Sequence, residues 1–165
     1  MNILITRPLM ESEDLMEKLF SLGHNIIHIP TLKILPLDIN ISDGTNYDAL
    51  IFTSANAIRN LKIKNIDRDI PCFCVGSITE KIARKAGHKN TFSAGGTVNA
   101  LKNLIIGSDL INNRSRIAYF CGDHLSFDLE NELKQEGFNV EKIINYKSEK
   151  IVELNNENKD IVSNH

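Results

Sequence analysis

DALIFTSANAI, residues 48–58, is an uninterrupted apolar run that passes directly into small polar residues and then into a helical pattern. The same order recurs in ILITRP (3–8), CFCVGSIT (72–79) and IAYFCGD (117–123). Continuous apolar runs are typical of parallel strands that are buried on both faces. The sequence therefore predicts strands of a parallel sheet, each followed by a polar turn.

Helical patterns separate these apolar runs along the chain. Leu at positions i and i+4, followed four residues later by Gly, occurs in residues 15–23 and again in 129–137, which is typical of a helix face and its C-terminal cap. We predict strands near 2–6, 25–29, 48–53, 71–75, 90–92, 116–121 and 139–145, and helices near 9–22, 55–62, 77–86, 97–106 and 125–136. Such alternation predicts an α/β fold with right-handed crossovers.

The chain is predicted to form two unequal lobes. Residues 47–142 contain a complete doubly wound lobe, whereas residues 1–35 supply only strand, helix and strand, which cannot cover their own apolar faces. Residues 36–46 and 143–152 have extended character and are predicted to connect the lobes, and residues 153–165 form a polar tail. We therefore expect the first lobe to be incomplete.

The composition excludes several classes of protein. The chain has 165 residues, 42% apolar, with a formal net charge of −2, so neither disorder nor a nucleic-acid surface is indicated. No apolar run approaches the roughly 20 residues of a membrane span, and the N-terminus has no signal-peptide pattern, which predicts a cytoplasmic protein. The three cysteines fit no metal spacing, and no nucleotide-binding motif is present. No metal or organic cofactor is predicted.

Candidate binding residues follow the strands. In an open α/β sheet, ligands lie outside the carboxyl ends of the strands, and hydroxyls and free backbone N–H groups there suit an oxygen-rich anion. The candidates at these turns are Thr53, Ser54, Asn56, Gly76, Ser77, Thr79 and Gly122. Arg7, after the first strand, is a further candidate because its guanidinium can pair with a carboxylate. Simple helix capping by these residue types, and a surface ion pair for Arg7, remain equally open.

Three other polar residues are given structural roles. We expect Asp123 to cap the helix that follows it. His24 and His88 follow helix-ending glycines, which is typical of surface residues.

ILITRP (3–8), LGHNIIHIP (22–30), DALIFTSANAI (48–58), CVGSITEKIARKAG (74–87) and YFCGDHLSFDLENELKQEGFNVEKIINYKSE (119–149) together resemble the uroporphyrinogen-III synthase family. This resemblance implies two flavodoxin-like lobes joined by extended two-strand connectors. It also implies a lyase of tetrapyrrole and haem biosynthesis, which closes linear hydroxymethylbilane with inversion of ring D and loss of water.

The resemblance implies a catalytic residue and a small-molecule substrate, a linear tetrapyrrole with eight carboxylates. Tyr146 matches the tyrosine at the end of the family's return strand, which implies a proton donor to the leaving hydroxyl. The alternative is a half-buried connector tyrosine.

The family's chain continues beyond the second connector, and nothing in residues 154–165 resembles that continuation. The resemblance therefore implies a truncated or split protein, with a separately encoded remainder of the first lobe as a partner. Two alternatives stay open: a non-catalytic remnant of the enzyme, and a flavodoxin-like module that binds a small anionic ligand.

Overall fold

The computed structural model of this chain describes residues 1–41, 46–63, 66–153 and 159. The chain folds into two compact units. Unit 1 comprises Met1–Leu35 and the described residues from Ser148 onward, and unit 2 is Pro36–Lys147. The division falls within two strands, β3 (Leu32–Pro36) and β8 (Asn139–Lys150).

Unit 2 is built on a parallel sheet whose strands are ordered β8, β7, β4, β5, β6, with β3 added beyond β8. Its remaining elements are β4 (Ala49–Phe52), α2 (Ala55–Arg59), β5 (Cys72–Cys74), α3 (Ser77–Lys85), β6 (Thr91–Ser93), α4 (Val98–Ile106), β7 (Arg116–Gly122) and α5 (Leu129–Gln135). Each adjacent pair from β8 to β6 is parallel, as crossover helices require. The α/β prediction is therefore confirmed.

β3 runs antiparallel to β8. The Leu37 N–H donates to the Asn145 carbonyl, and the Ile151 N–H donates to the Thr31 carbonyl. Because the partner's number falls as the residue number rises, the two strands run in opposite directions. The residue pattern predicted extended chain in this region without a bounded strand, whereas the resemblance implied a two-strand connector.

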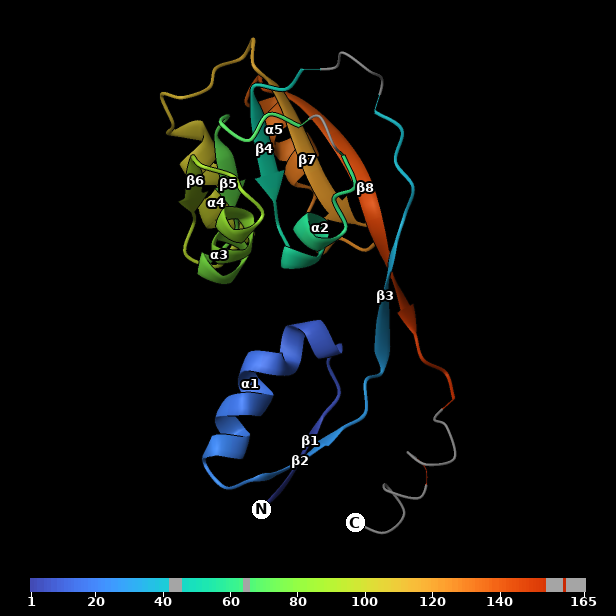
Figure 1. Cartoon of the computed structure of the whole chain (residues 1–165). Helices are drawn as coiled ribbons and strands as arrows, with labels where there is room; N and C mark the ends of the chain where they lie inside the picture. The colour runs from blue at the N-terminus through green and yellow to red at the C-terminus, as the bar shows by residue number, and fades with distance from the viewer. Residues whose placement is uncertain (42–45, 64–65, 154–158, 160–165) are drawn as a thin grey trace. The chain divides into compact units, whose positions relative to one another are not determined.

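Helices cover both faces of the sheet in unit 2 (Figure 1). Ile51 packs in one cluster with residues of α4 and α5, whereas Leu50 and Phe52 pack in a second cluster with residues of α2 and α3. All four residues of β4 are buried. Burial on both faces explains why this strand is an unbroken apolar run rather than an alternating one.

Unit 1 has little core of its own. It contains β1 (Asn2–Ile5), α1 (Leu9–Ser21) and β2 (Asn25–His28), with β1 and β2 paired in parallel. Ser12 is the buried residue of α1. Many large apolar side chains of this unit are exposed: Met1, Leu4, Leu9, Met10, Leu15, Phe20 and Leu22. This many exposed apolar side chains in one small unit exceeds the scattered single residues of an ordinary protein surface.

The last helix begins later than the sequence indicated. α5 starts at Leu129 because Asp128 caps it, with the Asp128 carboxylate accepting a hydrogen bond from the Asn131 N–H at 3.3 Å. The residues just before Asp128 form a loop. The expectation that Asp123 caps this helix was therefore wrong.

His88 is buried, with 2% of its surface exposed, so the expectation of a surface histidine was wrong. Gly87, at φ +97°, turns the chain back over the end of α3, and the His88 N–H donates to the Ala83 carbonyl. The imidazole lies against Phe52, with ring centroids 5.8 Å apart, and its Nε2 is 3.3 Å from the Arg68 guanidinium. Burial, and secondarily the charge of Arg68, lowers the pKa of His88 to about 4.

This buried histidine predicts acid sensitivity of the fold. The unfolded chain binds a proton below about pH 6.5, whereas folded His88 binds one only near pH 4, so stability falls as the pH drops through that window. We expect His88→Gln, which cannot titrate, to remove about 2 kcal/mol of the stability loss between pH 7 and pH 5. Urea unfolding at both pH values measures this, with His24→Gln as the control. An identical pH dependence in His88→Gln and the unsubstituted chain would contradict the assignment.

Candidate functional site

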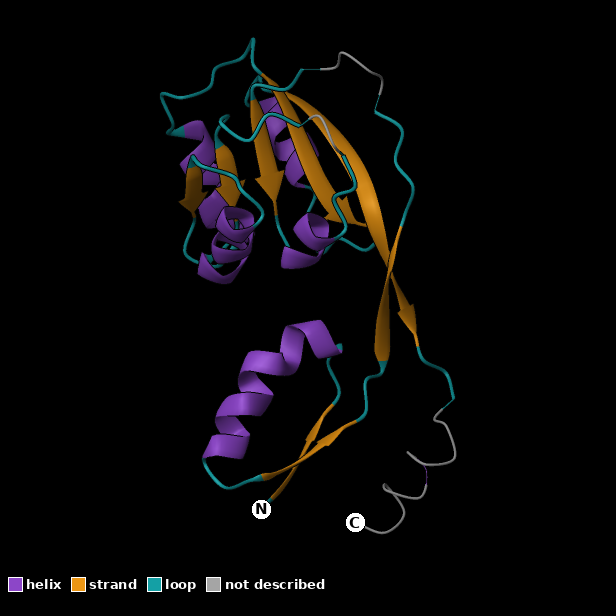
Figure 2. Ribbon diagram, in the orientation of Figure 1, coloured by secondary structure: helices purple, strands orange, loops and turns teal. Residues whose placement is uncertain are grey.

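The predicted binding turns of unit 2 lie at one edge of its sheet. Thr53 and Ser54 directly follow β4. Gly76 and Ser77 lie shortly after the end of β5, and Gly122 is the last residue of β7. These strands are parallel, so their carboxyl ends point the same way (Figure 2). Because ligands of such sheets lie outside the carboxyl ends, this edge is the candidate site.

Two of the turns at this edge are packed backbone against backbone. The Gly96 N–H donates to the Val75 carbonyl at 2.7 Å. A Cβ added to Gly76 would lie 3.3 Å from the Gly96 Cα, and Gly96 itself has φ +106°, which favours glycine. The glycines therefore let the turns after β5 and β6 approach each other.

The candidates after β4 have structural partners. Ser54 caps α2, since its hydroxyl accepts a hydrogen bond from the Asn56 N–H at 3.1 Å. Asn56 is buried, with 6% exposure, and its side-chain oxygen accepts from the Arg59 guanidinium at 3.3 Å. The capping expected of these residue types is therefore present for Ser54, and Asn56 is largely withdrawn from solvent.

The turn after β5 is more open. Gly76 precedes α3 and brings no side chain, so no side-chain hydrogen bond caps the first turn of this helix. Ser77 is exposed, whereas Thr79 is buried, with 6% exposure. The N–H groups at the start of α3, next to the exposed Ser77, are the part of this turn suited to an anion.

Tyr146 and Gly122 are brought together by an irregularity in β8. Cys121 pairs with Ile144, but Gly122 pairs with Tyr146, so Asn145 is an extra residue on β8. A Cβ on Gly122 would lie 2.7 Å from two ring carbons of Tyr146. The phenol ring therefore rests directly on the Gly122 backbone, at the same edge as the binding turns.

Asn145 anchors this β-bulge to the neighbouring helix. Its side chain is fully buried, and its Nδ2 donates to the Ala57 carbonyl of α2 at 2.6 Å. Bulges re-aim the side chains that follow them. Asn145 was not among the predicted site residues, because an Asn between Ile and Tyr has no distinctive pattern in the sequence.

A second residue missed by the sequence is Tyr119 on β7. Its side chain is 1% exposed, and its hydroxyl lies 3.2 Å from the Thr53 hydroxyl. Burial raises the pKa of Tyr119 to about 12. The sequence does contain one indication of this role, namely a tyrosine inside an otherwise apolar, buried strand. A buried phenol hydroxyl needs a hydrogen-bond partner, so such a tyrosine is expected to contact another polar group.

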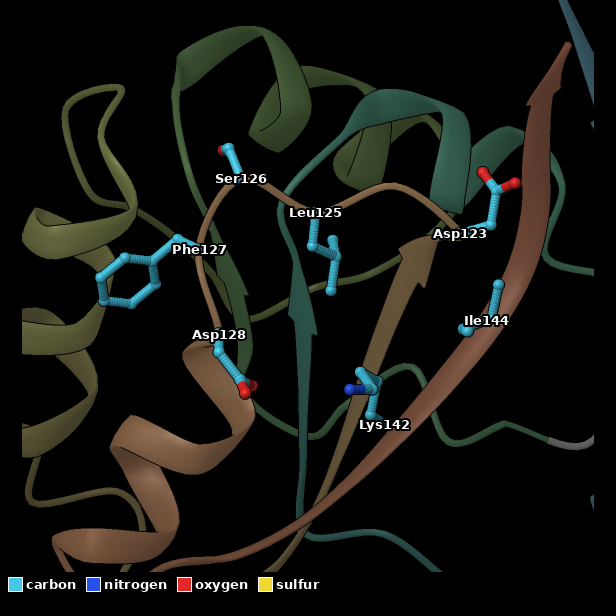
Figure 3. Close-up of a pocket in the computed structure, with 7 residues that line it drawn as sticks. All are labelled: Asp123, Leu125, Ser126, Phe127, Asp128, Lys142 and Ile144. Carbon is cyan, nitrogen blue, oxygen red and sulfur yellow. The ribbon is translucent and has the colours of Figure 1, made fainter.

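A pocket of about 380 Å³ opens beside the loop that follows Gly122 (Figure 3). It is lined by Asp123, Leu125, Ser126, Phe127, Asp128, Lys142 and Ile144. The Lys142 amino group and the Asp128 carboxylate point toward each other across it. Lys142 and Ile144 could have been paired from the sequence, because alternate residues of a strand share a face.

Glu130 stabilises the positive charge on Lys142. The Lys142 amino group lies 2.9 Å from Glu130, which also pairs with Lys134 at 2.7 Å. The hydrogen bond that Lys142 donates to Glu130 raises the pKa of Lys142. Burial would raise the pKa of Glu130, but the two lysines outweigh it and lower this pKa. The pocket thus combines one ammonium with two carboxylates and an apolar wall.

Arg7 belongs to unit 1, where its guanidinium pairs with Glu11 at 2.8 Å and stays 65% exposed. This is the surface ion pair named above as its alternative role.

Metal-binding clusters and membrane-spanning helices are both absent from the residues that the structure describes. These residues include no group of three His, Cys, Asp or Glu side chains placed to hold a metal ion. No helix among them has the length and apolar character needed to cross a membrane.

Comparison with known proteins agrees with this architecture. The sequence model of the family described as uroporphyrinogen-III synthase HemD matches residues 13–165. A uroporphyrinogen-III synthetase structure from Helicobacter pylori is 18% identical, with a TM-score of 0.60, covering 84% of this chain and 61% of that one. A mutant uroporphyrinogen III synthase from Thermus thermophilus is 17% identical, with a TM-score of 0.55, covering 89% of this chain and 62% of that one.

The chain thus spans about three fifths of the length of these solved relatives. Identities this low show a shared fold and no more. No curated protein sequence matches the chain.

Proposed function

This chain belongs to the uroporphyrinogen-III synthase family, and from that premise we propose that it acts in closing hydroxymethylbilane to uroporphyrinogen III. The observation that carries the proposal is the family match over residues 13–165. The proposed reaction is that of a lyase in haem biosynthesis: water leaves one end of the linear tetrapyrrole, and the last ring is inverted before closure. The proposed setting is the cytoplasm.

In this proposal Tyr146 donates a proton to the leaving hydroxyl. A phenol is protonated at neutral pH and can act as a hydrogen-bond donor. The ring of Tyr146 rests on Gly122 at the carboxyl edge of the sheet, and ligands of open α/β sheets lie outside that edge. The substrate supplies most of the electron push, so the protein's tasks are orientation and proton donation.

The substrate's carboxylates are proposed to bind along the same edge. The exposed Ser77 and the uncapped first turn of α3 offer hydroxyl and N–H donors. Thr53 offers a partly exposed hydroxyl beside them. The Lys142 ammonium offers a positive charge in the neighbouring pocket. Three candidates of unit 2 are less available to a ligand, since Ser54 caps α2 and both Asn56 and Thr79 are largely buried. Arg7 remains a candidate within unit 1.

Unit 1 is proposed to require a further polypeptide segment. Its α1 and β1 expose several large apolar side chains, Phe20 at 73% among them. A parallel sheet is normally covered on both faces, and α1 can cover only one face of the β1–β2 pair. About two fifths of the length of each of these solved relatives lies outside the part that this chain covers. A segment that pairs with β1 or β2 and covers these side chains is the partner we propose.

The test is an enzyme assay in which hydroxymethylbilane is generated in place and the products are separated as type III and type I isomers. The type I isomer forms spontaneously, so formation of the type III isomer supports the proposal. This result counts whether it is obtained with the chain alone or after the segment proposed to complete unit 1 has been added. Type I product alone, with binding of the linear tetrapyrrole in a calorimetric titration, would indicate a non-catalytic remnant. If neither type III product nor binding of the linear tetrapyrrole is found, the alternative of a flavodoxin-like module that binds another small anion is favoured.

A further inference from the structure

We propose that Tyr119 is a positioning residue that directs the Thr53 hydroxyl, as a hydrogen-bond donor, toward a carboxylate of the ligand. Thr53 was a candidate from the sequence, but Tyr119 was not, and the two side chains are joined only in the folded structure. The inference rests on the proposed function, since it names the group of that substrate which Thr53 binds.

The two hydroxyls meet because of the register of neighbouring strands. Ile51 of β4 pairs with Tyr119 of β7. Thr53 lies two residues beyond Ile51, so its side chain leaves the same face of the sheet. The Tyr119 ring extends toward the carboxyl edge and brings its hydroxyl to 3.2 Å from the Thr53 hydroxyl. Tyr119 is buried and Thr53 is partly exposed, so this hydrogen bond connects the core to the edge.

The direction of the hydrogen bond follows from the acceptors near Tyr119. A phenol has one O–H, and a buried O–H needs an acceptor. The Cys121 thiol also interacts with Tyr119, but sulfur is a weak acceptor compared with a hydroxyl oxygen. In this proposal Tyr119 therefore donates to Thr53. The proton of Tyr119 stays in place at neutral pH, because burial raises its pKa to about 12.

This direction decides what Thr53 can bind. With its oxygen accepting from Tyr119, the Thr53 O–H is free to point away, toward the exposed side. Successive hydrogen bonds polarise one another in a low-dielectric environment, so the outward O–H becomes a better donor. Such a donor favours an anionic acceptor, and a carboxylate is the strongest acceptor that the proposed substrate carries.

Titration calorimetry of the full chain with uroporphyrinogen III tests this arrangement. We expect Thr53→Val to weaken binding roughly ten-fold, since a hydrogen bond to a charged group is lost. Tyr119→Phe keeps the ring and removes the polarising donor, so about three-fold weaker binding is expected. The double variant should bind no more weakly than Thr53→Val, and Thr53→Ser should stay within about two-fold of the unsubstituted chain, because it keeps the hydroxyl.

The matched control is Tyr47→Phe. Tyr47 is also a buried tyrosine, but it precedes β4 and lies at the opposite end of the strand. Tyr47→Phe deletes the same kind of atom, a phenol oxygen, but far from Thr53. It should therefore leave ligand binding unchanged. Thermal unfolding of each variant shows whether the fold is kept, and a role limited to stability would lower the melting temperature of Tyr119→Phe without changing its affinity.

Unchanged or tighter binding by Tyr119→Phe would overturn the proposal, because the reversed hydrogen bond would release the Thr53 donor. Additive effects of Thr53→Val and Tyr119→Phe would overturn it as well. If the unsubstituted chain binds no uroporphyrinogen III, tricarballylate, a small tricarboxylate, becomes the probe, and the proposed function is judged separately by the isomer assay described above. An NMR response of the Thr53 amide that weakens in Tyr119→Phe would then support the inference, and no response at Thr53 would overturn it.

Discussion

Tyr146→Phe is expected to lower the rate of type III product formation on the order of 100-fold, the lower range for loss of a general acid. The substitution removes one oxygen and keeps the ring that rests on Gly122. The fold should therefore be retained, with little change in the free energy of unfolding. Steady-state rates are to be measured in whichever preparation forms the type III isomer.

The control is again Tyr47→Phe, which removes the corresponding oxygen at the far end of the sheet. Its rate should equal that of the unsubstituted chain. A fall in kcat with an unchanged KM is the expected pattern for Tyr146→Phe, because the donor acts on the leaving group in the transition state. Full activity of Tyr146→Phe would exclude this tyrosine from the chemistry.

Gly122→Ala is expected to cause a comparable loss of turnover by displacing the Tyr146 ring. The new Cβ would lie 2.7 Å from two ring carbons and 2.9 Å from the phenol oxygen, closer than such contacts allow. Gly122 has no positive φ, so the effect is steric rather than a matter of backbone strain. Relieving the overlap should destabilise unit 2 by about 1–3 kcal/mol, which urea unfolding measures.

Gly107→Ala is the matched control for this prediction. Gly107 ends α4 at φ −81°, and its added Cβ would lie 3.2 Å from the Asn103 carbonyl oxygen. It therefore introduces a tight contact away from the tyrosine, and turnover should not change. The double variant Gly122→Ala with Tyr146→Phe should be no slower than the slower single variant, because both act on one hydroxyl. If the rate losses of the two single variants multiply in the double variant, Gly122 contributes to turnover independently of the Tyr146 hydroxyl.

Within the candidate site, the positions of the turns were predictable and their hydrogen bonds were not. The unbroken apolar runs at β4 and β7 predicted buried parallel strands, and parallel strands place the turns after them at one edge. Thr53, Gly76 and Gly122 were identified in this way. The capping by Ser54, the burial of Thr79 and the ion pair of Arg7 depend on which atoms lie near, and residue type left these roles open.

The contacts that give the site its shape join residues far apart in the chain. Tyr119 and Thr53 are 66 residues apart, and Asn145 reaches Ala57 across 88 residues. The bulge at Asn145 places Tyr146 opposite Gly122 rather than one position further along. His88 is buried for the same kind of reason, because Phe52 and Arg68 enclose it.

The sequence by itself therefore determined the alternation of strands and helices, the double burial of β4 and the edge that carries the polar turns. Periodicity reports which faces of an element are apolar, and that information is local. Only the tertiary structure decided the register of β8, the partner of the Thr53 hydroxyl and the surroundings of His88. Each of these depends on which distant segments become neighbours, and a one-residue shift in pairing changes every such contact without changing the local pattern.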